Sequence, residues 1–271
     1  MPDLSIRVRR ALFGLSRREA DFATRGFTAT AADKRACLES VGRRFIDGYH
    51  AWLAEDLDSE LAQGDPALCG FAVEGAAMAC TLLDYLDYLT PWRRDRWTRL
   101  LADRPEHIYM AHIGAGWATA RRHGSLRRAI GRRDPLLGWL VADGWGFHQT
   151  YFHPARFAPQ RRADLWSGVG LAATYAGGCE AADLEALVTL AGRCRAPLAQ
   201  GAAFAATARA VAGNLTPSVD RAAHALSGLS GVELWKLSKT CEPRAPHGRF
   251  GDDYEHWRAR LRAALGSSEA A

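Results

Sequence analysis

The residue types that can carry acid–base chemistry are concentrated in one stretch, residues 134–153, which reads DPLLGWLVADGWGFHQTYFH. Asp143, His148 and His153 are spaced five apart in it, and aromatic residues fill most of the gaps. Apolar surroundings shift the pKa of an ionisable group towards neutrality, because burial penalises the charged form. The stretch therefore predicts either a partly desolvated site or a core helix whose histidines bond to backbone carbonyls.

A further carboxylate, Glu74, lies inside the small and apolar run GFAVEGAAMA at residues 70–79. A carboxylate in such a run is either favoured by the dipole of a helix start or buried for function, and we expect burial. The candidate catalytic residues are therefore Asp143, His148, Glu74 and His153. We predict one pocket lined by ionisable and aromatic side chains, namely Asp143, His148, Glu74, Trp145 and Phe152.

Aromatic side chains near these groups are candidates for holding an apolar substrate, although such residues more often belong to an ordinary core. Their mixture with ionisable groups favours a binding role, because charge without partners is expensive inside a protein. The candidate substrate-binding residues are Trp117, Trp139, Trp145, Tyr151, Phe152 and Trp166.

Cofactor motifs receive little support from the sequence. The pair His148 and His153 would project about 140° apart on a straight helix, which is poor geometry for chelating one metal ion, so no metal site is predicted. A haem ligand needs no second histidine, so haem ligation by His148 or His153 stays an alternative. The run Gly168–Ala173 matches a dinucleotide pattern only formally, because the residues before it are helical in type. The cofactor is left unknown.

An arginine cluster occupies residues 121–133, RRHGSLRRAIGRR, which hold six arginines. Such a run is most often a solvated connector between helices. The alternative is an anion-binding role, because a guanidinium group pairs with oxyanions through two parallel hydrogen bonds. We predict an anion-binding surface with the candidate residues Arg121, Arg122, Arg127 and Arg128.

The elements that must position these side chains are predicted to be helices. Apolar segments recur along the chain, each ended by glycine or opened by proline, and no segment shows the period-two alternation of a strand. We expect an all-α fold of packed helical hairpins, resembling a repeat array but without a strict repeat period. The expected helices cover residues 32–61, 70–89, 107–122, 134–153, 160–176, 183–195, 198–212 and 217–229.

Length and composition favour a single helical domain over residues 1–271, with a basic lead-in at 1–30 and a poorly defined segment at 240–271. The six cysteines are scattered and no secretory signal is visible, which predicts a reduced, cytoplasmic protein. No transmembrane segment is expected, because acidic residues interrupt the longest apolar run. The net charge of +5 favours anionic partners, but no nucleic-acid-binding signature is present.

Seven runs of the chain carry a family resemblance: RGF (25–27), GRRFIDGYH (42–50), GFAVEGAAMA (70–79), IYMAHIGAGWATAR (108–121), DGWGFHQTYFH (143–153), RRADLWSGVGLAATYAGG (161–178) and LAQGAAFAATARAVAGN (198–214). They resemble a bacterial family of unknown biochemical function found in enediyne biosynthetic gene clusters (UnbL-type). The resemblance implies a role in natural-product assembly, beside an iterative polyketide synthase that makes a long linear polyene.

Three functions follow as expectations. The first is an enzyme that acts on a long unsaturated apolar chain by acid–base chemistry at Asp143 and His148, with Glu74 as a second carboxylate. The second is a non-catalytic scaffold that docks a carrier protein or the polyketide synthase through the arginine cluster. The third is a haem- or metal-dependent enzyme with His148 or His153 as ligand.

Overall fold

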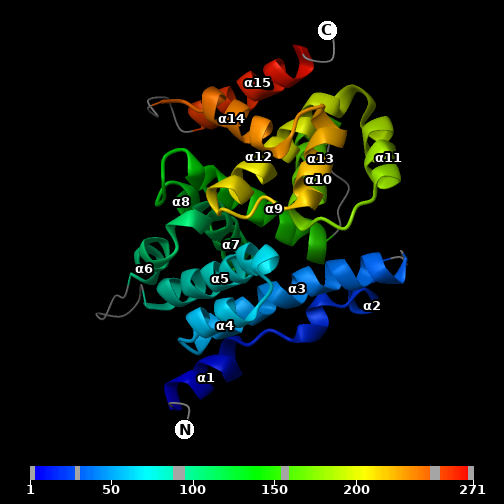
Figure 1. Ribbon diagram of the computed structural model, residues 1–271. Helices are drawn as coiled ribbons and strands as arrows, with labels where there is room; N and C mark the ends of the chain where they lie inside the picture. The colour runs from blue at the N-terminus through cyan, green and yellow to red at the C-terminus, as the bar shows by residue number, and fades with distance from the viewer. Residues whose placement is uncertain (1–3, 28–30, 88–94, 154–158, 245–250, 268–271) are drawn as a thin grey trace. The chain divides into compact units, whose positions relative to one another are not determined.

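The regular secondary structure of the chain is entirely helical over the described residues, 4–27, 31–87, 95–153, 159–244 and 251–267 of the computed structural model. This confirms the predicted all-α fold. The chain divides into two compact units, Met1–Ala155 and Arg156–Ala271, which Figure 1 colours blue to green and green to red along the chain.

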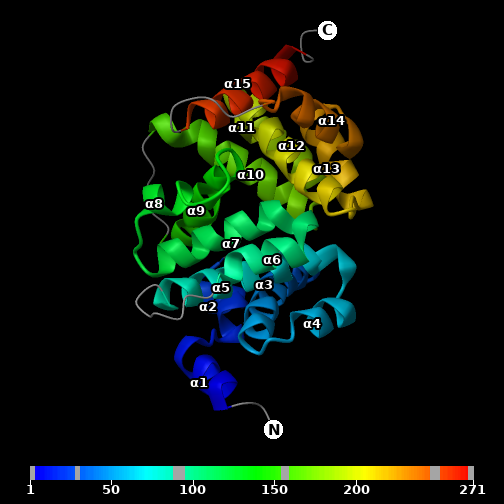
Figure 2. The same ribbon diagram turned by 90° about the vertical axis from the view of Figure 1, so that its left-hand side faces the viewer.

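The N-terminal unit is built on four long helices that pack successively, α3 on α5, α5 on α7 and α7 on α9. Figures 1 and 2 show α3, α5 and α7 side by side, with short helices around them. The helices of this unit are α1 (Leu4–Phe13), α2 (Phe22–Arg25), α3 (Ala32–Leu53), α4 (Leu57–Gln63), α5 (Cys69–Asp87), α6 (Arg96–Asp103), α7 (Ile108–Arg121), α8 (Leu126–Ile130) and α9 (Leu140–Phe152).

The C-terminal unit is organised around one buried helix, α12, against which the other helices of the unit pack. Every residue of α12 from Leu198 to Arg209 is buried. The helices are α10 (Arg162–Ala176), α11 (Ala181–Ala191), α12 (Arg195–Val211), α13 (Pro217–Ser227), α14 (Gly231–Cys241) and α15 (Asp252–Ser267). The last of them is well anchored, because Trp257 is fully buried and donates its indole N–H to the carbonyl oxygen of Ser238 at 3.0 Å.

Side-chain caps begin five of the described α-helices, α6, α8, α11, α13 and α14. Thr216 accepts a hydrogen bond from the N–H of Val219 and precedes a proline at the first position of α13. The start of α9 differs from expectation. Asp134 accepts bonds from the N–H groups of Leu136 and Leu137, at 2.9 and 2.7 Å, and so holds the turn that leads into the short 3₁₀ helix Leu137–Trp139. The α-helix therefore begins only at Leu140.

Reciprocal close contacts between a glycine and a backbone carbonyl hold several helix pairs together. In the α7–α9 pair, Gly116 faces the oxygen of Val141 and Gly144 faces the oxygen of Ile113, and a Cβ at either glycine would lie within 2.2 Å of that oxygen. The same arrangement, with each glycine three residues after a contacted carbonyl, recurs in the α3–α5 and α10–α12 pairs. In the α3–α5 pair, Gly48 faces the oxygen of Ala72 and Gly75 faces that of Phe45. In the α10–α12 pair, Gly170 faces the oxygen of Leu198 and Gly201 faces that of Ser167. The repeat-like character of the chain is thus one helix crossing built three times.

The helix α5 is the apolar core helix of the N-terminal unit. The stretch Pro66–Asp87 is long and apolar enough to cross a membrane by length and composition, but 72% of its most apolar window is buried inside the structure. Residues 72–81 are buried without exception. A core helix passes the same composition test as a membrane span, so this burial agrees with the expected absence of a transmembrane segment.

Candidate functional site

The side chain of Trp117, on α7, joins the candidate acid–base groups of the N-terminal unit. Its indole N–H donates to Oε1 of Glu74, on α5, at 2.8 Å, and this is the one side-chain hydrogen bond of Glu74 among the described residues. Glu74 is only 6% exposed. Burial raises its pKa to about 8, and the bond from Trp117 offsets that rise only in part. Glu74 is therefore mainly protonated at neutral pH, and it can both give and take a proton.

The imidazole of His148, on α9, packs against the indole of Trp117. Its ring centre lies 5.7 Å from that of Trp117, and its Nδ1 is buried without a hydrogen-bond partner among the described residues. Burial is the main cause that lowers the pKa of His148 to about 4, and the nearby charges of His153, Arg121 and His123 lower it further. His148 is therefore neutral at pH 7.

Aromatic rings enclose these groups and complete what we call the Trp117 cluster. The rings of Phe45, Tyr151 and Phe152 lie 5.3, 6.0 and 6.2 Å from the ring of Trp117. The cluster consists of Glu74, Trp117, His148, Phe45, Tyr151 and Phe152. Tyr151 is held in place by its hydroxyl, which donates to the carbonyl oxygen of Glu19 at 2.7 Å. Two titratable groups that are neutral at pH 7 thus lie among aromatic rings, and the cluster buries no full charge at that pH.

Several residues predicted from the sequence meet in this cluster, namely Glu74, Trp117, His148, Tyr151 and Phe152. His153 lies at its edge, exposed just beyond α9, with its ring 6.1 Å from that of His148. The predicted roles of these residues in binding and catalysis stay predictions.

Other predicted residues lie elsewhere. Asp143 is in the first turn of α9 and leaves the helix about 140° away from His148. Trp145 is half-buried on α9, whereas Trp139 packs with Ile130 and Val141 in a core formed with α8. Trp166 belongs to α10 of the C-terminal unit.

Sequence reasoning missed Phe45, a member of the cluster, and Arg25, which contacts it. Phe45 was visible only as a member of the apolar face of a helix, because nothing local links it to a tryptophan far along the chain. The guanidinium of Arg25 lies over the ring of Phe152 at 5.0 Å, and such a stacking contact has no local sequence signal.

The arginine run between α7 and α9 is split by the fold. The four predicted anion-binding residues, Arg121, Arg122, Arg127 and Arg128, are all exposed. Arg133 instead turns inwards, donates to the carbonyl oxygen of Ala129 at 2.7 Å, and lies 4.5 Å over the ring of Trp97. The four predicted residues therefore lie at the surface, where Arg122 also stacks on the ring of Tyr85 at 4.0 Å, whereas Arg133 is half-buried.

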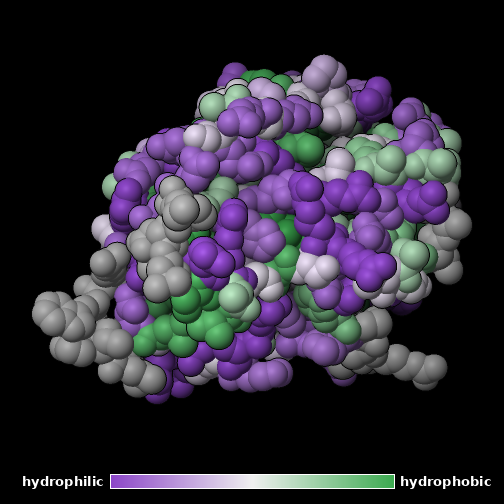
Figure 3. Space-filling view, turned by 90° about the horizontal axis from the view of Figure 1, so that it is seen from below, coloured by the Kyte–Doolittle hydropathy of each residue, from purple (hydrophilic) through white to green (hydrophobic). Residues whose placement is uncertain are grey.

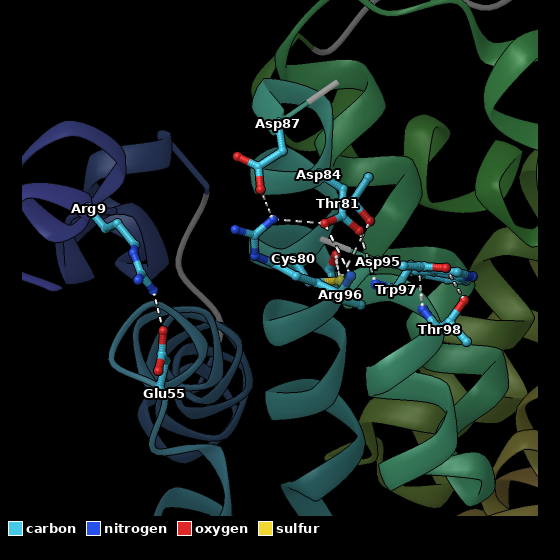
Figure 4. A network of polar contacts seen from close by, with 11 residues as sticks. Arg9, Glu55, Cys80, Thr81, Asp84, Asp87, Asp95, Arg96, Trp97 and Thr98 are labelled. Carbon is cyan, nitrogen blue, oxygen red and sulfur yellow. Dashed lines mark hydrogen bonds and ion pairs between the residues drawn. The ribbon is translucent and has the colours of Figure 1, made fainter. Parts of the chain in front are cut away.

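A second polar region, between α5 and α6, serves to fix the fold (Figure 4). Asp84 on α5 accepts hydrogen bonds from the backbone N–H groups of Arg96 and Trp97, at 3.3 and 3.0 Å, and so caps α6 from a neighbouring helix. The guanidinium of Arg96 also pairs with Asp84 and Asp87, at 3.1 and 2.7 Å. Nearby, the Nδ1 of His112 bonds to the carbonyl oxygen of Ile108 at 2.8 Å, which is the arrangement expected of a core histidine.

A groove of about 550 Å³ lies on the same unit. Trp52, Leu83 and Leu100 are among its apolar lining residues. Arginines on its rim pair with acidic neighbours, as Arg104 does with Asp58. These charges satisfy one another, so the groove has less acid–base chemistry to offer than the Trp117 cluster. Within the described part of the chain, no group of three or more histidine, cysteine, aspartate or glutamate side chains could hold a metal ion.

Glu74 predicts a specific pH dependence of stability. Its pKa rises from an ordinary value of 4.5 to about 8 on folding, so the folded protein binds this proton more tightly than the unfolded chain. The resulting stabilisation is fully present below pH 4.5 and is lost as pH rises towards 8, at about 1.4 kcal/mol per unit. We expect Glu74→Gln to remove this slope.

Urea denaturation of wild type and variant at several values between pH 4.5 and 8 measures the effect. The free energy of unfolding of Glu74→Gln should rise relative to wild type as pH increases. The control is Glu185→Gln, at an exposed glutamate of α11, which should track wild type throughout. Parallel curves for Glu74→Gln and wild type would show that the carboxyl ionises normally.

The fold and the cluster together define a class: an all-α protein whose N-terminal unit holds a desolvated carboxyl–indole–imidazole cluster. The chain belongs to the family DUF1702, described as a protein of unknown function, whose model matches residues 5–156 and 154–265. Comparison with curated proteins gives no match, and comparison with solved structures gives none either. The description of the family names no activity.

Proposed function

We propose that this protein is an acid–base enzyme of bacterial natural-product assembly that acts on a long unsaturated apolar chain at the Trp117 cluster. The observation that supports this most is the buried carboxyl group of Glu74, with one hydrogen-bond donor and a pKa of about 8. A proton donor is most effective when its pKa lies near the operating pH. Glu74 therefore takes the central role in the proposal, ahead of Asp143.

The reaction that fits two neutral groups is a double-bond shift. Glu74 donates its proton to one carbon of a conjugated chain, and His148 removes a proton from a carbon further along while the π electrons move between them. Proton return from His148 to Glu74 through water then resets the site. The product is an isomer of the substrate, so no oxidant or second substrate is required. The rings of Phe45, Tyr151 and Phe152 would hold the chain.

The resemblance to enediyne-cluster proteins supplies the context of the proposal. A cytoplasmic polyketide synthase or its carrier protein would deliver the polyene, and the exposed arginines 121, 122, 127 and 128 would meet the acidic surface of that partner. A non-catalytic scaffold would use the same arginines but would leave the polyene unchanged. The two functions can therefore be distinguished by whether the polyene is changed.

The direct test incubates purified protein in D₂O with the polyene extracted from producing cells that lack the protein. We expect an isomer that carries deuterium at the carbon protonated by Glu74, detected by mass spectrometry and NMR. Recovery of unlabelled, unchanged polyene would reject the enzyme and favour the scaffold. A visible spectrum of the same preparation tests the haem alternative, because bound haem would dominate it.

The variant His148→Gln is expected to abolish deuterium incorporation while the protein stays folded. Glutamine keeps some hydrogen bonding but cannot titrate in this range. If His148 were only a core residue, the change would cost stability on the order of 1–3 kcal/mol and leave activity in the folded fraction. Melting temperature and labelled product are measured on the same sample. A destabilised but active variant would end the catalytic assignment of His148.

A further inference from the structure

The helix α1 presents an apolar and basic face to solvent. Leu12 is 69% exposed and Val8 is 48% exposed, which are high values for large hydrophobic side chains. Arg7 and Arg10 are also exposed and form no ion pair with a described residue. Arg7 projects about 100° from Val8 and flanks the apolar face, whereas Arg10 projects about 160° from both Val8 and Leu12. The helix carries no acidic residue, so this face is uniformly basic where it is charged.

The opposite face of α1 accounts for its attachment to the rest of the N-terminal unit. Arg9 pairs with Glu55 at 2.7 Å, as Figure 4 shows. At the last residue of α1, the hydroxyl of Tyr49 donates to the carbonyl oxygen of Phe13 at 2.8 Å. Two residues further on, Leu15 donates its N–H to Nε2 of His50 at 2.9 Å. These contacts orient the helix, so the exposure of Val8 and Leu12 is a consequence of docking.

The position of α1 on its unit favours a flat partner. Figures 1 and 2 both show α1 at the end of the N-terminal unit, away from α5 and α7. Seen from below, that end shows hydrophobic side chains gathered among hydrophilic ones (Figure 3). A protruding helix that combines exposed apolar side chains with unpaired arginines is typical of interfacial helices, which insert their apolar face among acyl chains while the arginines contact anionic headgroups.

We propose that α1 binds the surface of an anionic lipid bilayer, with Val8 and Leu12 inserted at the headgroup boundary and Arg7, which flanks them, against lipid phosphates. This goes beyond the proposed reaction and does not depend on it. Binding rests on two weak contributions, one apolar and one electrostatic, so it should be reversible and should weaken with salt.

The test sediments the full-length protein with phosphatidylcholine vesicles that either contain or lack phosphatidylglycerol. We expect binding to the anionic vesicles only, and its loss at high salt. The variant Leu12→Glu should abolish binding. The variant Arg7→Gln should weaken it about fivefold, the contribution of one arginine near an anionic surface. Arg10→Gln, on the far side of the helix, should have a smaller effect.

Matched controls come from the C-terminal unit. Leu190, on α11, is 71% exposed, so Leu190→Glu changes an equally exposed leucine without touching α1. Arg193→Gln removes the same charge from an exposed position. Both controls should bind like wild type. Failure of wild type to sediment with anionic vesicles, or unchanged binding of Leu12→Glu, would overturn the proposal, and melting curves confirm that each variant is folded.

Discussion

Replacing Glu74 with glutamine is expected to lower the rate of double-bond shift by about 10²–10⁴-fold, the range that a positioned acid–base group contributes. Glutamine keeps the volume and accepts the indole hydrogen bond of Trp117 through its amide oxygen, but it has no proton to exchange. The rate of deuterium incorporation, measured on folded protein, reports the loss. Activity within a few-fold of wild type would remove Glu74 from the chemistry.

A second variant separates catalysis from structure at the same position. The bond from Trp117 lowers the pKa of Glu74, so Trp117→Phe, which keeps a ring but removes the N–H donor, should raise that pKa further. The active form is the protonated one, and wild type should lose activity as pH passes about 8. In Trp117→Phe this loss should move to higher pH. If Trp117→Phe lost activity at the same pH as wild type, a group other than Glu74 would set the pH dependence of activity.

Placing alanine at Gly170 is expected to destabilise the protein more than most core substitutions. A Cβ there would lie 2.0 Å from the carbonyl oxygen of Leu198, so α10 and α12 would have to separate. Overpacking of this kind typically costs about 1–3 kcal/mol, and backbone atoms cannot turn aside as side chains do. We expect a loss at or above the top of that range in urea denaturation.

The matched control lies two residues earlier on the same helix. A Cβ at Gly168 would meet no atom within 4 Å. Gly168→Ala should therefore stabilise α10 by about 0.5–1 kcal/mol, the ordinary gain of alanine over glycine inside a helix. Opposite signs for the two substitutions would confirm that the glycine–carbonyl crossing holds this pair together. Equal effects would show that the helices can shift apart at little cost.

Local patterns determined which segments are helical. Glycine and proline punctuation located most helix ends, because those residues act on the backbone of their own neighbourhood. The start of α9 escaped this reasoning. Asp134 satisfies the N–H groups of Leu136 and Leu137 in a turn before a 3₁₀ helix, and an aspartate followed by proline does not by itself reveal which kind of turn follows it.

The small-residue content of the helices pointed to close packing, but it left open which faces meet. The structure decides this through the reciprocal crossings, since each glycine allows approach only where a partner carbonyl lies opposite it. The α7–α9 crossing turns His148 towards Trp117, whereas Asp143, on the same helix, projects in another direction. Spacing along α9 favoured neither residue over the other.

The sequence by itself determined the all-α fold, the burial expected of Glu74, and the concentration of aromatic and ionisable residues in 134–153. Only the tertiary structure decided that Glu74 receives its hydrogen bond from Trp117, which lies 43 residues away, and that His148 packs on the same indole. The physical reason is that helix periodicity acts over a few residues, whereas the environment that sets a pKa is assembled by helices meeting across the core.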